Sequence, residues 1–329
     1  VGTGQGARAG ILVKNAEALE RAEKISVLGV DKTGTLTRGE PVVTDLVPLA
    51  LGSDEVLRLA AGLEQGSEHP LARAILQRAQ DEGAVLPKVG DFRAVPCKGV
   101  EGSIDGRQLR LGAPAWFPDL ELPQERIAAL QAAGKTVVAL VEDRAALALL
   151  AIADPLRESS RAAVARLKSM GLRVVMLTGD NAATAAAIAS EAGIDDFRAG
   201  ILPGDKAAAV ESLRAAGQIV AMVGDGINDA PALAKSEIGF AMAAAGTDTA
   251  IETADVALMD DDLRKIPAFI RLSQQTAVIL KQNIVLALGI KALFLAITLT
   301  GQATMWMAVF ADMGVSLLVV FNGLRLLKK

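Results

Sequence analysis

The sequence predicts an α/β fold in which a parallel sheet carries an inserted α+β domain and is followed by a hairpin of two membrane helices. Three observations support this expectation. Short apolar runs, each ending in a turn that contains an aspartate, alternate with helical patterns. A long segment with turns of its own interrupts this alternation after the first run. Two apolar stretches, each about the ~20 residues that a membrane helix needs, close the chain.

The composition restricts the class of protein. The chain has 329 residues, of which 51% are hydrophobic and 22% charged, and its formal net charge is −4. A chain of this kind is not disordered. Its slight acidity argues against a nucleic-acid partner, since no basic excess is present to neutralise phosphates. A single cysteine, Cys97, excludes a disulfide scaffold and a cysteine-cluster metal site.

The sheet domain is expected over residues 24–44 and 150–265. Its buried strands are predicted at Ile25–Val30, Val174–Leu177 and Ile219–Val223, and its helices at Ala182–Ser190, Asp205–Ala216 and Pro231–Lys235. In parallel sheets, ligands bind where the carboxyl ends of the strands meet. The aspartate-bearing turns after the three strands are therefore expected to lie together.

The inserted domain is expected over residues 45–149. This segment has turn signals at Asp105-Gly106 and Gly134-Lys135, and strand-like runs at Ser103–Leu111 and Thr136–Val141. It therefore reads as a separate α+β domain placed within the sheet domain.

The membrane hairpin is expected within residues 266–329, with helices at about 277–300 and 303–327. Basic residues flank the outer ends of the pair, whereas the turn at Thr300-Gly301-Gln302 is uncharged. The positive-inside rule then places both outer ends in the cytoplasm. The alternative is a buried hairpin in a soluble protein.

Two charged residues lie near the middle of the predicted helices. Lys291 lies 10 residues before Gly301, and Asp312 lies 11 residues after it. At ~1.5 Å per residue both lie ~15 Å deep, level with each other and near the bilayer centre. Charges at that depth are costly and usually functional. The alternative is an ion pair that only holds the hairpin together.

The sharpest chemical motif is Asp31-Lys32-Thr33-Gly34-Thr35-Leu36-Thr37, at the end of the first predicted strand. A carboxylate there can attack phosphorus and form an acyl phosphate, while Lys32 offsets charge on the transferred group. Many hydrolases of the haloacid dehalogenase type have a second aspartate two residues after the nucleophile. Thr33 occupies that position here and is no general base near neutral pH. We therefore expect the aspartyl phosphate to persist.

The two later turns bring more polar groups to the same edge. Mg²⁺ prefers oxygen ligands and often shares them with phosphate, so Asp31, the Thr33 carbonyl and Asp225 form a predicted Mg²⁺ site. Asp229 and Asn228 follow closely behind. Lys206, at a predicted helix start, could contact a phosphoryl oxygen, or could simply be an exposed lysine.

The inserted domain holds the chain's one histidine in the string Glu64-Gln65-Gly66-Ser67-Glu68-His69-Pro70-Leu71. The functional interpretation is that His69 contacts a nucleotide, by stacking on adenine or by hydrogen bonding to it. An ordinary surface or core histidine is the alternative.

Taken together, the strings DKTGTLT, TGD and GDGINDAPAL resemble the P-type cation-transporting ATPases, and SEHPLA resembles the heavy-metal branch, type IB. This resemblance implies a haloacid-dehalogenase-like phosphorylation domain in which ATP phosphorylates Asp31. It implies a nucleotide-binding role for the insert, with Glu64 and His69 on adenine and Gly99 also at the ATP. The residues implied around the phosphoryl group are Lys32, Thr33, Thr178, Gly179, Asp180, Lys206 and Asn228, with Asp225 and Asp229 near Mg²⁺.

Two positions depart from the family's pattern. Cys97 stands where the first glycine of a Gly-x-Gly pair is usual, and Gly112-Ala113 stands where Gly-Asn is usual. We expect a weaker or altered contact with ATP at both.

The metal is predicted from the last helices. Asp312-x-Gly314 with an upstream lysine resembles the zinc/cadmium/lead branch, which implies that Asp312 binds the transported ion and that Lys291 serves as its counter-charge. Aspartate is a hard ligand, whereas Cu(I) prefers thiolate and thioether. Met305, Met307 and Met313 leave copper export as the alternative.

Some parts of the family's pattern have no counterpart in the sequence. It contains neither the Thr-Gly-Glu string of an actuator domain nor a Cys-Pro-Cys membrane motif, and residues 1–23 read as a stub after a preceding membrane helix. We therefore expect the C-terminal part of a multi-pass cell-membrane exporter with its catalytic domains in the cytoplasm. Its partners would be ATP, a divalent heavy-metal ion, lipid, and the missing actuator domain and earlier helices. The alternatives of other classes are a membrane-anchored phosphohydrolase and a non-catalytic regulatory fragment.

Overall fold

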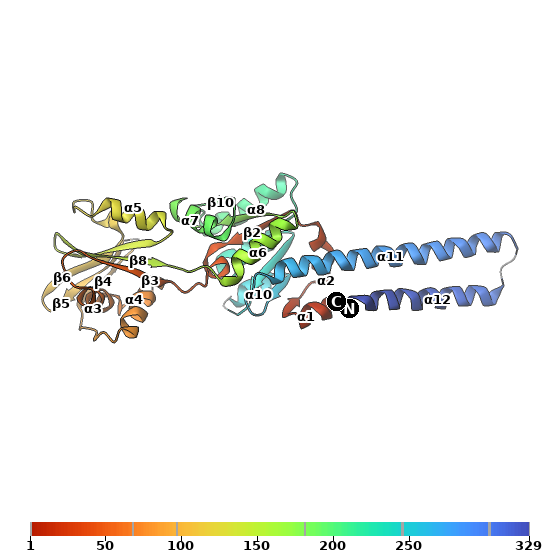
Figure 1. Ribbon diagram of the computed structural model, residues 1–329, viewed down its shortest axis with the longest axis horizontal. Coiled ribbons are helices and arrows are strands. Elements are labelled where there is room, and N and C mark those ends of the chain that lie inside the picture. The colour runs from red at the N-terminus through yellow and green to blue at the C-terminus, as the bar shows by residue number, and fades with distance from the viewer. Residues whose placement is uncertain are drawn as a thin grey trace. The chain divides into compact units, whose positions relative to one another are not determined.

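The computed structural model describes residues 2–67, 69–96, 98–180, 182–244, 247–301 and 304–328. The chain forms two compact units. The first comprises Val1–Val30, Ala162–Val174 and Pro203–Lys329, and the second comprises Asp31–Arg161 and Val175–Leu202. The strands belong to two sheets, one of seven strands and one of six (Figure 1).

The seven-stranded sheet has the order β1-β13-β12-β11-β2-β9-β10. Its strands are β1 (Ile11–Val13), β2 (Val27–Asp31), β9 (Arg173–Leu177), β10 (Asp196–Arg198), β11 (Val220–Gly224), β12 (Ile238–Met242) and β13 (Val256–Leu258). Strands β2, β11 and β12 are buried along their whole length, which explains why their sequences are continuously apolar and do not alternate. The predicted α/β class is confirmed, and the three predicted strands lie within two residues of β2, β9 and β11.

Parallel pairing brings the aspartate-bearing turns to one edge of this sheet. Strand β11 pairs in parallel with β2 and with β12, and Val223 lies opposite Val30. Because both strands end one residue after this pair, Asp31 and the turn that follows Gly224 lie at the same edge. This is the arrangement expected from the sequence.

Helices cover this sheet and connect its strands. They are α1 (Gly2–Arg8), α2 (Ala16–Arg21), α6 (Glu158–Ser169), α7 (Ala182–Ala192), α8 (Lys206–Ala215), α9 (Ala230–Lys235) and α10 (Asp248–Thr253), with short 3-10 turns η1 (Ala22–Lys24), η4 (Pro203–Asp205) and η5 (Ile227–Asp229). Helices α7, α8 and α9 lie where the sequence predicts helices.

The first residues of the chain are part of the fold. Strand β1 pairs antiparallel with β13, so Ile11 lies opposite Leu258 at the edge of the sheet. Helix α2 begins after Asn15, whose side chain accepts a hydrogen bond from the backbone N–H of Glu17 and caps the helix. The sequence pattern predicts neither element in this segment.

The six-stranded sheet has the order β3-β8-β7-β6-β5-β4 and is antiparallel throughout. Its strands are β3 (Val42–Pro48), β4 (Gly90–Val95), β5 (Gly99–Ile104), β6 (Arg107–Gly112), β7 (Thr136–Glu142) and β8 (Ala145–Ala153). The strand-like run Ser103–Leu111 is a hairpin, because Asp105 and Gly106 both have positive φ and turn the chain between β5 and β6.

Alternation along β7 builds a core on each face of this sheet. Val138 and Leu140 pack toward α3 (Ser53–Glu64) and α4 (Pro70–Asp81). Val137 and Val141 belong to a second cluster that includes residues of α5 (Gln124–Ala132). This two-residue period is the geometry of a pleated strand buried on both sides. Figure 1 shows α5 on one side of the sheet and α3 and α4 on the other.

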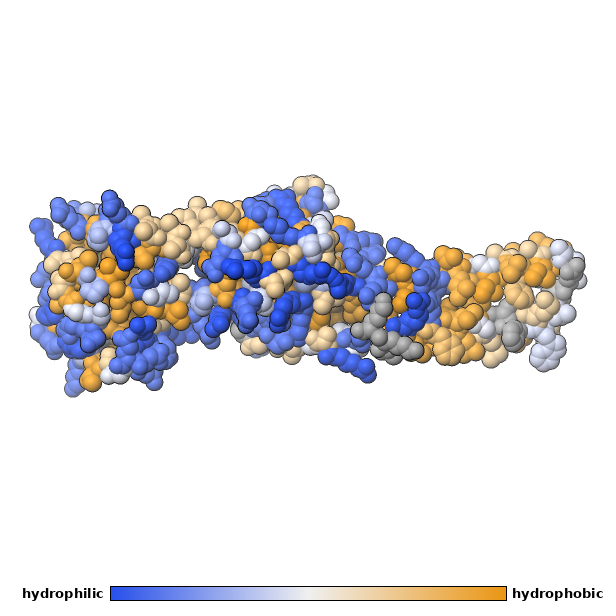
Figure 2. All heavy atoms as spheres, viewed as in Figure 1, coloured by the Kyte–Doolittle hydropathy of each residue, from blue (hydrophilic) through white to orange (hydrophobic). Residues whose placement is uncertain are grey.

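The C-terminal hairpin consists of α11 (Lys265–Leu299) and α12 (Met305–Leu324). Both are long and apolar enough to cross a membrane, and the most apolar window of α11 is 0% buried. That exposure argues against a hairpin buried in a soluble core. Figure 2 shows hydrophobic residues over the outer part of the hairpin. The first helix begins 12 residues before the apolar stretch at Ala277, since Ile266, Phe269 and Ile270 are buried.

Candidate active site

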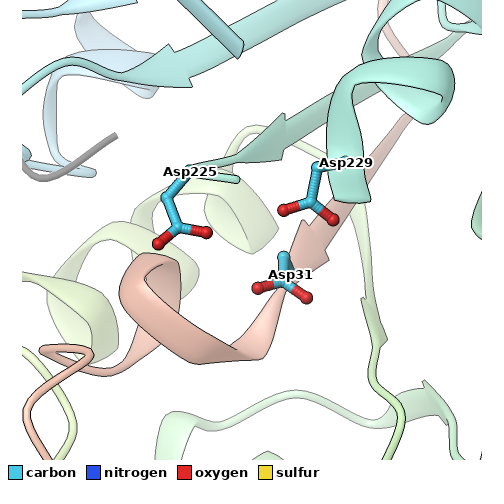
Figure 3. Close-up of side chains that lie close together, drawn as sticks. All are labelled: Asp31, Asp225 and Asp229. Carbon is cyan, nitrogen blue, oxygen red and sulfur yellow. The ribbon is translucent and has the colours of Figure 1, made fainter. Parts of the chain in front are cut away.

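Three aspartates from the two neighbouring strands converge at one point. Asp31 ends β2, Asp225 follows β11, and Asp229 lies in η5. Each offers a carboxylate oxygen, and these oxygens all lie within 4.8 Å of one another (Figure 3). Asp31 and Asp229 are 5% and 2% exposed, whereas Asp225 is half-buried. The cluster is therefore reached from the side of Asp225.

The chemistry of this cluster fits Mg²⁺. Close carboxylates repel one another unless cations balance them. Lys206 balances Asp229, since its Nζ lies 2.7 Å from Asp229 Oδ1 and both side chains are nearly inaccessible to solvent. Carboxylate oxygens are also the ligands that Mg²⁺ prefers. The residues present thus suit a divalent cation placed between Asp31 and Asp225.

A second ion pair lies next to Asp31. Lys32 Nζ lies 2.8 Å from Asp180 Oδ2, which also accepts a hydrogen bond of 2.9 Å from the hydroxyl of Thr178. The Asp180 backbone N–H donates to the same hydroxyl at 3.2 Å. Asp180 thus holds the Lys32 ammonium through a turn that is itself hydrogen-bonded. Gly179 lies between Thr178 and Asp180, and a Cβ added to it would lie 3.3 Å from the Ile201 carbonyl oxygen.

The loop after Asp31 is a tight turn over Lys32–Leu36. Gly34 has φ +71°, which favours glycine, and the Thr37 backbone N–H donates to the Lys32 carbonyl at 3.0 Å. Thr33 is exposed, whereas the Thr35 side chain is buried and its hydroxyl lacks a hydrogen-bond partner among the described residues. Asn228 is exposed in η5.

The sequence reading missed two residues that hold this loop. Asp154 accepts hydrogen bonds from the Thr37 hydroxyl at 2.6 Å and from the Gly39 backbone N–H at 3.0 Å. Arg157 donates to the carbonyls of Gly34 and Thr37 at 2.9 and 3.0 Å. The sequence signal was Asp154-Pro155 directly after the apolar run of β8, a pair that favours a turn.

The residues predicted to contact nucleotide line one cavity of about 400 Å³ on the six-stranded sheet. Glu64, His69, Gly99 and Ala113 all line it. Cys97 lies outside the described residues. A Cβ on Gly99 would lie 2.1 Å from the Leu111 carbonyl oxygen, and one on Gly112 would lie 2.3 Å from the Lys98 carbonyl oxygen. Both positions therefore require glycine, which keeps the two strands close at the cavity wall.

His69 has a structural role besides its place in the cavity. Its Nδ1 accepts a hydrogen bond of 3.2 Å from the Leu71 backbone N–H and so caps helix α4. A neutral imidazole that accepts at Nδ1 carries its proton on Nε2. His69 therefore has an N–H donor left for a ligand.

Glu64 is buried, 8% exposed, and one of its carboxylate oxygens has no hydrogen-bond partner among the described residues. Burial raises its pKa above the ordinary glutamate value, and a hydrogen bond from Ser67 offsets this only in part. A protonated Glu64 can donate a hydrogen bond to a ring nitrogen or carbonyl, and an ionised one can accept from an amine.

We predict that Glu64→Gln stabilises the chain at pH 7. The raised pKa means that the folded state binds this proton more tightly, so the wild type loses stability as the pH rises from the ordinary carboxyl pKa through the raised one. Glutamine has no charge to desolvate, and the expected gain is about 1 kcal/mol. Thermal unfolding at pH 7 and pH 4 measures it. The gain should shrink at the lower pH, and the exposed Glu121→Gln should show none.

The two charges of the hairpin are exposed in α11 and α12, and the structure gives no ion pair between Lys291 and Asp312 among the residues it describes. The hydrogen bond of 2.9 Å from Asn322 to Asn283 marks one level that the two helices share. The depths of Lys291 and Asp312 can be counted from it. Lys291 lies eight residues from Asn283 and Asp312 lies ten from Asn322, so along antiparallel helices they differ by ~3 Å in depth.

Comparison with known proteins accounts for the whole chain. A model of haloacid dehalogenase-like hydrolases matches residues 25–236. The chain belongs to this family. A probable cadmium-transporting ATPase of Staphylococcus aureus is 41% identical to the chain over 99% of its length. The zinc/cadmium/lead-transporting P-type ATPase of Escherichia coli K12 is 43% identical over 100%. A probable copper-transporting ATPase of Synechococcus elongatus is 47% identical over 87%.

Solved structures agree with this placement in the family. A zinc-transporting PIB-type ATPase in its E2.Pi state has a TM-score of 0.88 and 43% identity over 99% of the chain. The catalytic domain of the CPx-ATPase CopB-B has a TM-score of 0.68 and 28% identity over 82%. The resemblance to heavy-metal P-type ATPases is thus confirmed. The chain spans 42–44% of the length of the curated cadmium and zinc relatives named here.

Proposed function

We propose that this chain is the C-terminal, catalytic part of an ATP-driven exporter of a divalent heavy-metal ion, with Zn²⁺, Cd²⁺ and Pb²⁺ as its candidate substrates. The observation that carries the proposal is the buried Asp31 carboxylate beside Asp225 and Asp229, in a chain that also has two exposed apolar helices. Under this proposal the actuator domain and earlier membrane helices belong to the same pump, and the catalytic units face the cytoplasm.

Phosphoryl transfer from ATP to Asp31 is the proposed reaction. An Asp31 carboxylate oxygen attacks the γ-phosphorus, and the bond from this phosphorus to the oxygen that bridges to the β-phosphate breaks. ADP leaves with the electron pair of that bond, and an acyl phosphate remains on Asp31. Asp31, the Thr33 carbonyl and Asp225 would hold Mg²⁺ with Asp229 beside them, and Mg²⁺ would neutralise phosphate charge there.

The remaining polar groups would position the nucleotide and neutralise charge on the transferred phosphoryl group. Lys32, held by Asp180 and Thr178, can offset charge on the transferred group. We assign Lys206, Asn228 and Gly179 to the surroundings of the same group. Glu64 and His69 would bind the adenine, and the close strands at Gly99 would let the nucleotide approach the backbone.

Labelled ATP tests the proposed function. Incubated with Mg²⁺ and γ-labelled ATP, the protein is expected to carry a label that survives acid and is removed by hydroxylamine, as an acyl phosphate does. Free phosphate released quickly without a label would indicate a membrane-anchored phosphohydrolase instead. Neither label nor free phosphate would indicate a non-catalytic regulatory fragment, and either of these two results rejects the pump.

The proposed identity of the transported ion depends on Asp312. We predict that Asp312→Asn in the intact pump reduces zinc-stimulated ATPase activity to the unstimulated level, because a neutral amide is a much poorer ligand for a divalent ion in a low-dielectric setting. Met313→Leu is the matched control, since it changes the neighbouring thioether and should leave zinc stimulation intact. Copper export predicts the reverse: stimulation by Cu(I) that survives Asp312→Asn and falls in Met313→Leu.

A further inference from the structure

A cavity of about 600 Å³ lies away from the catalytic residues, between α11 and the turn that follows α12, η6 (Arg325–Lys328). Two arginines line it, Arg271 on α11 and Arg325 on η6. Glutamine side chains from α11 line it as well, and its apolar wall includes Val278 and Ile279. Cations, amides and aliphatic groups therefore share one space.

The lengths of the helices place this cavity at a membrane boundary. A hydrocarbon core of ~30 Å takes ~20 residues of helix at ~1.5 Å each. Counted back from Leu299, the core along α11 ends near Leu280, and α12 ends at Leu324 after 20 residues. Arg325 thus follows the core directly, and Arg271 lies nine residues of helix, ~13.5 Å, beyond Leu280 at the same end of the hairpin. The basic residues there make this end cytoplasmic.

The two arginines differ in what they already bind. Arg325 donates to the Asn322 side-chain oxygen at 3.0 Å, and Asn322 donates in turn to Asn283 at 2.9 Å and Gln282 at 3.3 Å. This chain of hydrogen bonds links the guanidinium group of Arg325, through Nη1, to α11 and leaves most of its five N–H donors for a ligand. Arg271 is exposed, and its side chain makes no hydrogen bond or ion pair with any residue in the described part of the chain.

We propose that this cavity binds the headgroup of an anionic phospholipid of the cytoplasmic leaflet. The planar guanidinium groups of Arg271 and Arg325 match the paired oxygens of a phosphodiester, and Gln282 can donate to its ester or glycerol oxygens. Val278 and Ile279 contact the first carbons of an acyl chain, which runs from the cavity into the hydrocarbon core. The cytoplasmic leaflet supplies such lipids at high local concentration.

The chemistry of the cavity selects this occupant over others. Two arginines repel a metal cation, so the exported ion does not bind here. A free phosphate shares the phosphate oxygens but has nothing to place against Val278 and Ile279. The inference rests on the membrane setting of the proposed function, and it uses no residue of the catalytic or metal sites.

The test uses the intact pump in phosphatidylcholine vesicles, with or without phosphatidylglycerol. After extraction into a neutral detergent, native mass spectrometry counts the phosphatidylglycerol retained. We expect Arg271→Gln and Arg325→Gln each to lower its retention about fivefold. Arg271→Lys should also lower retention, since lysine keeps the charge but loses the paired hydrogen bonds. Lys281→Gln, exposed on the same helix and outside the cavity, should retain the lipid.

Three results would overturn the inference. One is retention that is unchanged in Arg271→Gln and Arg325→Gln. Another is an equal loss in Lys281→Gln, which indicates general attraction of charge to the membrane. The third is displacement of the lipid by inorganic phosphate, which indicates a site for a soluble anion. Zinc-stimulated ATPase activity is measured in the same vesicles. If this activity is absent with every lipid, the proposed function is rejected, while the retention of phosphatidylglycerol still decides whether the lipid site exists.

Discussion

Replacement of Asp31 by asparagine is expected to abolish the acid-stable label that γ-labelled ATP leaves on the protein. The amide of asparagine is not nucleophilic enough to attack phosphorus, and no other carboxylate has the position of Asp31 at the end of β2. Asp225 and Asp229 lie nearby, but Asp229 is 2% exposed and paired with Lys206. The expected loss is therefore complete. Autoradiography of acid-precipitated protein measures it.

A matched control keeps this result specific. Asp248 is an exposed aspartate in the first turn of α10. Asp248→Asn therefore makes the same chemical change as Asp31→Asn: it replaces a carboxylate by an amide and removes one negative charge. This variant should be labelled like the wild type. Titration of Asp31→Asn with nucleotide measures binding, and binding shows that the variant is folded. A label that persists in folded Asp31→Asn would falsify the aspartyl-phosphate mechanism and the proposed pump with it.

Thr33→Asp is expected to convert a persistent phosphoenzyme into one that hydrolyses quickly. Thr33 is exposed, two residues beyond Asp31 on the loop, and a carboxylate at this place can take a proton from an attacking water. General base catalysis is worth about 10²–10⁴-fold in rate. Decay of the label after a chase with unlabelled ATP should quicken by that order. Release of free phosphate should rise to the same extent.

Thr33→Asn is the control for this variant. Asparagine has nearly the shape of aspartate but cannot accept the proton, so its label should decay at the wild-type rate. Equal decay in the aspartate and asparagine variants would contradict the role given to Thr33. Faster decay in both would indicate that disturbance of the loop, and not proton transfer, exposes the acyl phosphate to water.

The sequence was most informative where local chemistry and sheet geometry act together. Asp31 and Asp225 could be predicted to meet because each follows a buried parallel strand, and the pairing of Val30 with Val223 brings the two strand ends level. The glycines at the cavity of about 400 Å³ on the six-stranded sheet are less evident from the sequence. Gly99 is essential because of Leu111, a neighbour across a strand pair, which no local pattern identifies.

Other features depend on partners far along the chain. Strand β1 has three residues, too few for a period to be seen, and its partner Leu258 lies 247 residues after Ile11. The pairing of Lys206 with Asp229 joins residues of two different turns whose approach is set by packing. The role of His69 as a helix cap was missed because histidine is an uncommon residue at that position. The start of α11 was missed because hydropathy marks the membrane segment and not the helix.

The length of α11 has a mechanical consequence. Its 35 residues form one unbroken helix of ~52 Å, anchored at one end by Ile266, Phe269 and Ile270 in the core of the sheet domain and exposed at the other. A rod of this kind works as a lever. A tilt of ~5° at the anchored end swings the far end by ~5 Å, about one helical turn. Under the proposed function, small adjustments around a phosphorylated Asp31 would in this way be magnified into a displacement large enough to open or close a path for an ion.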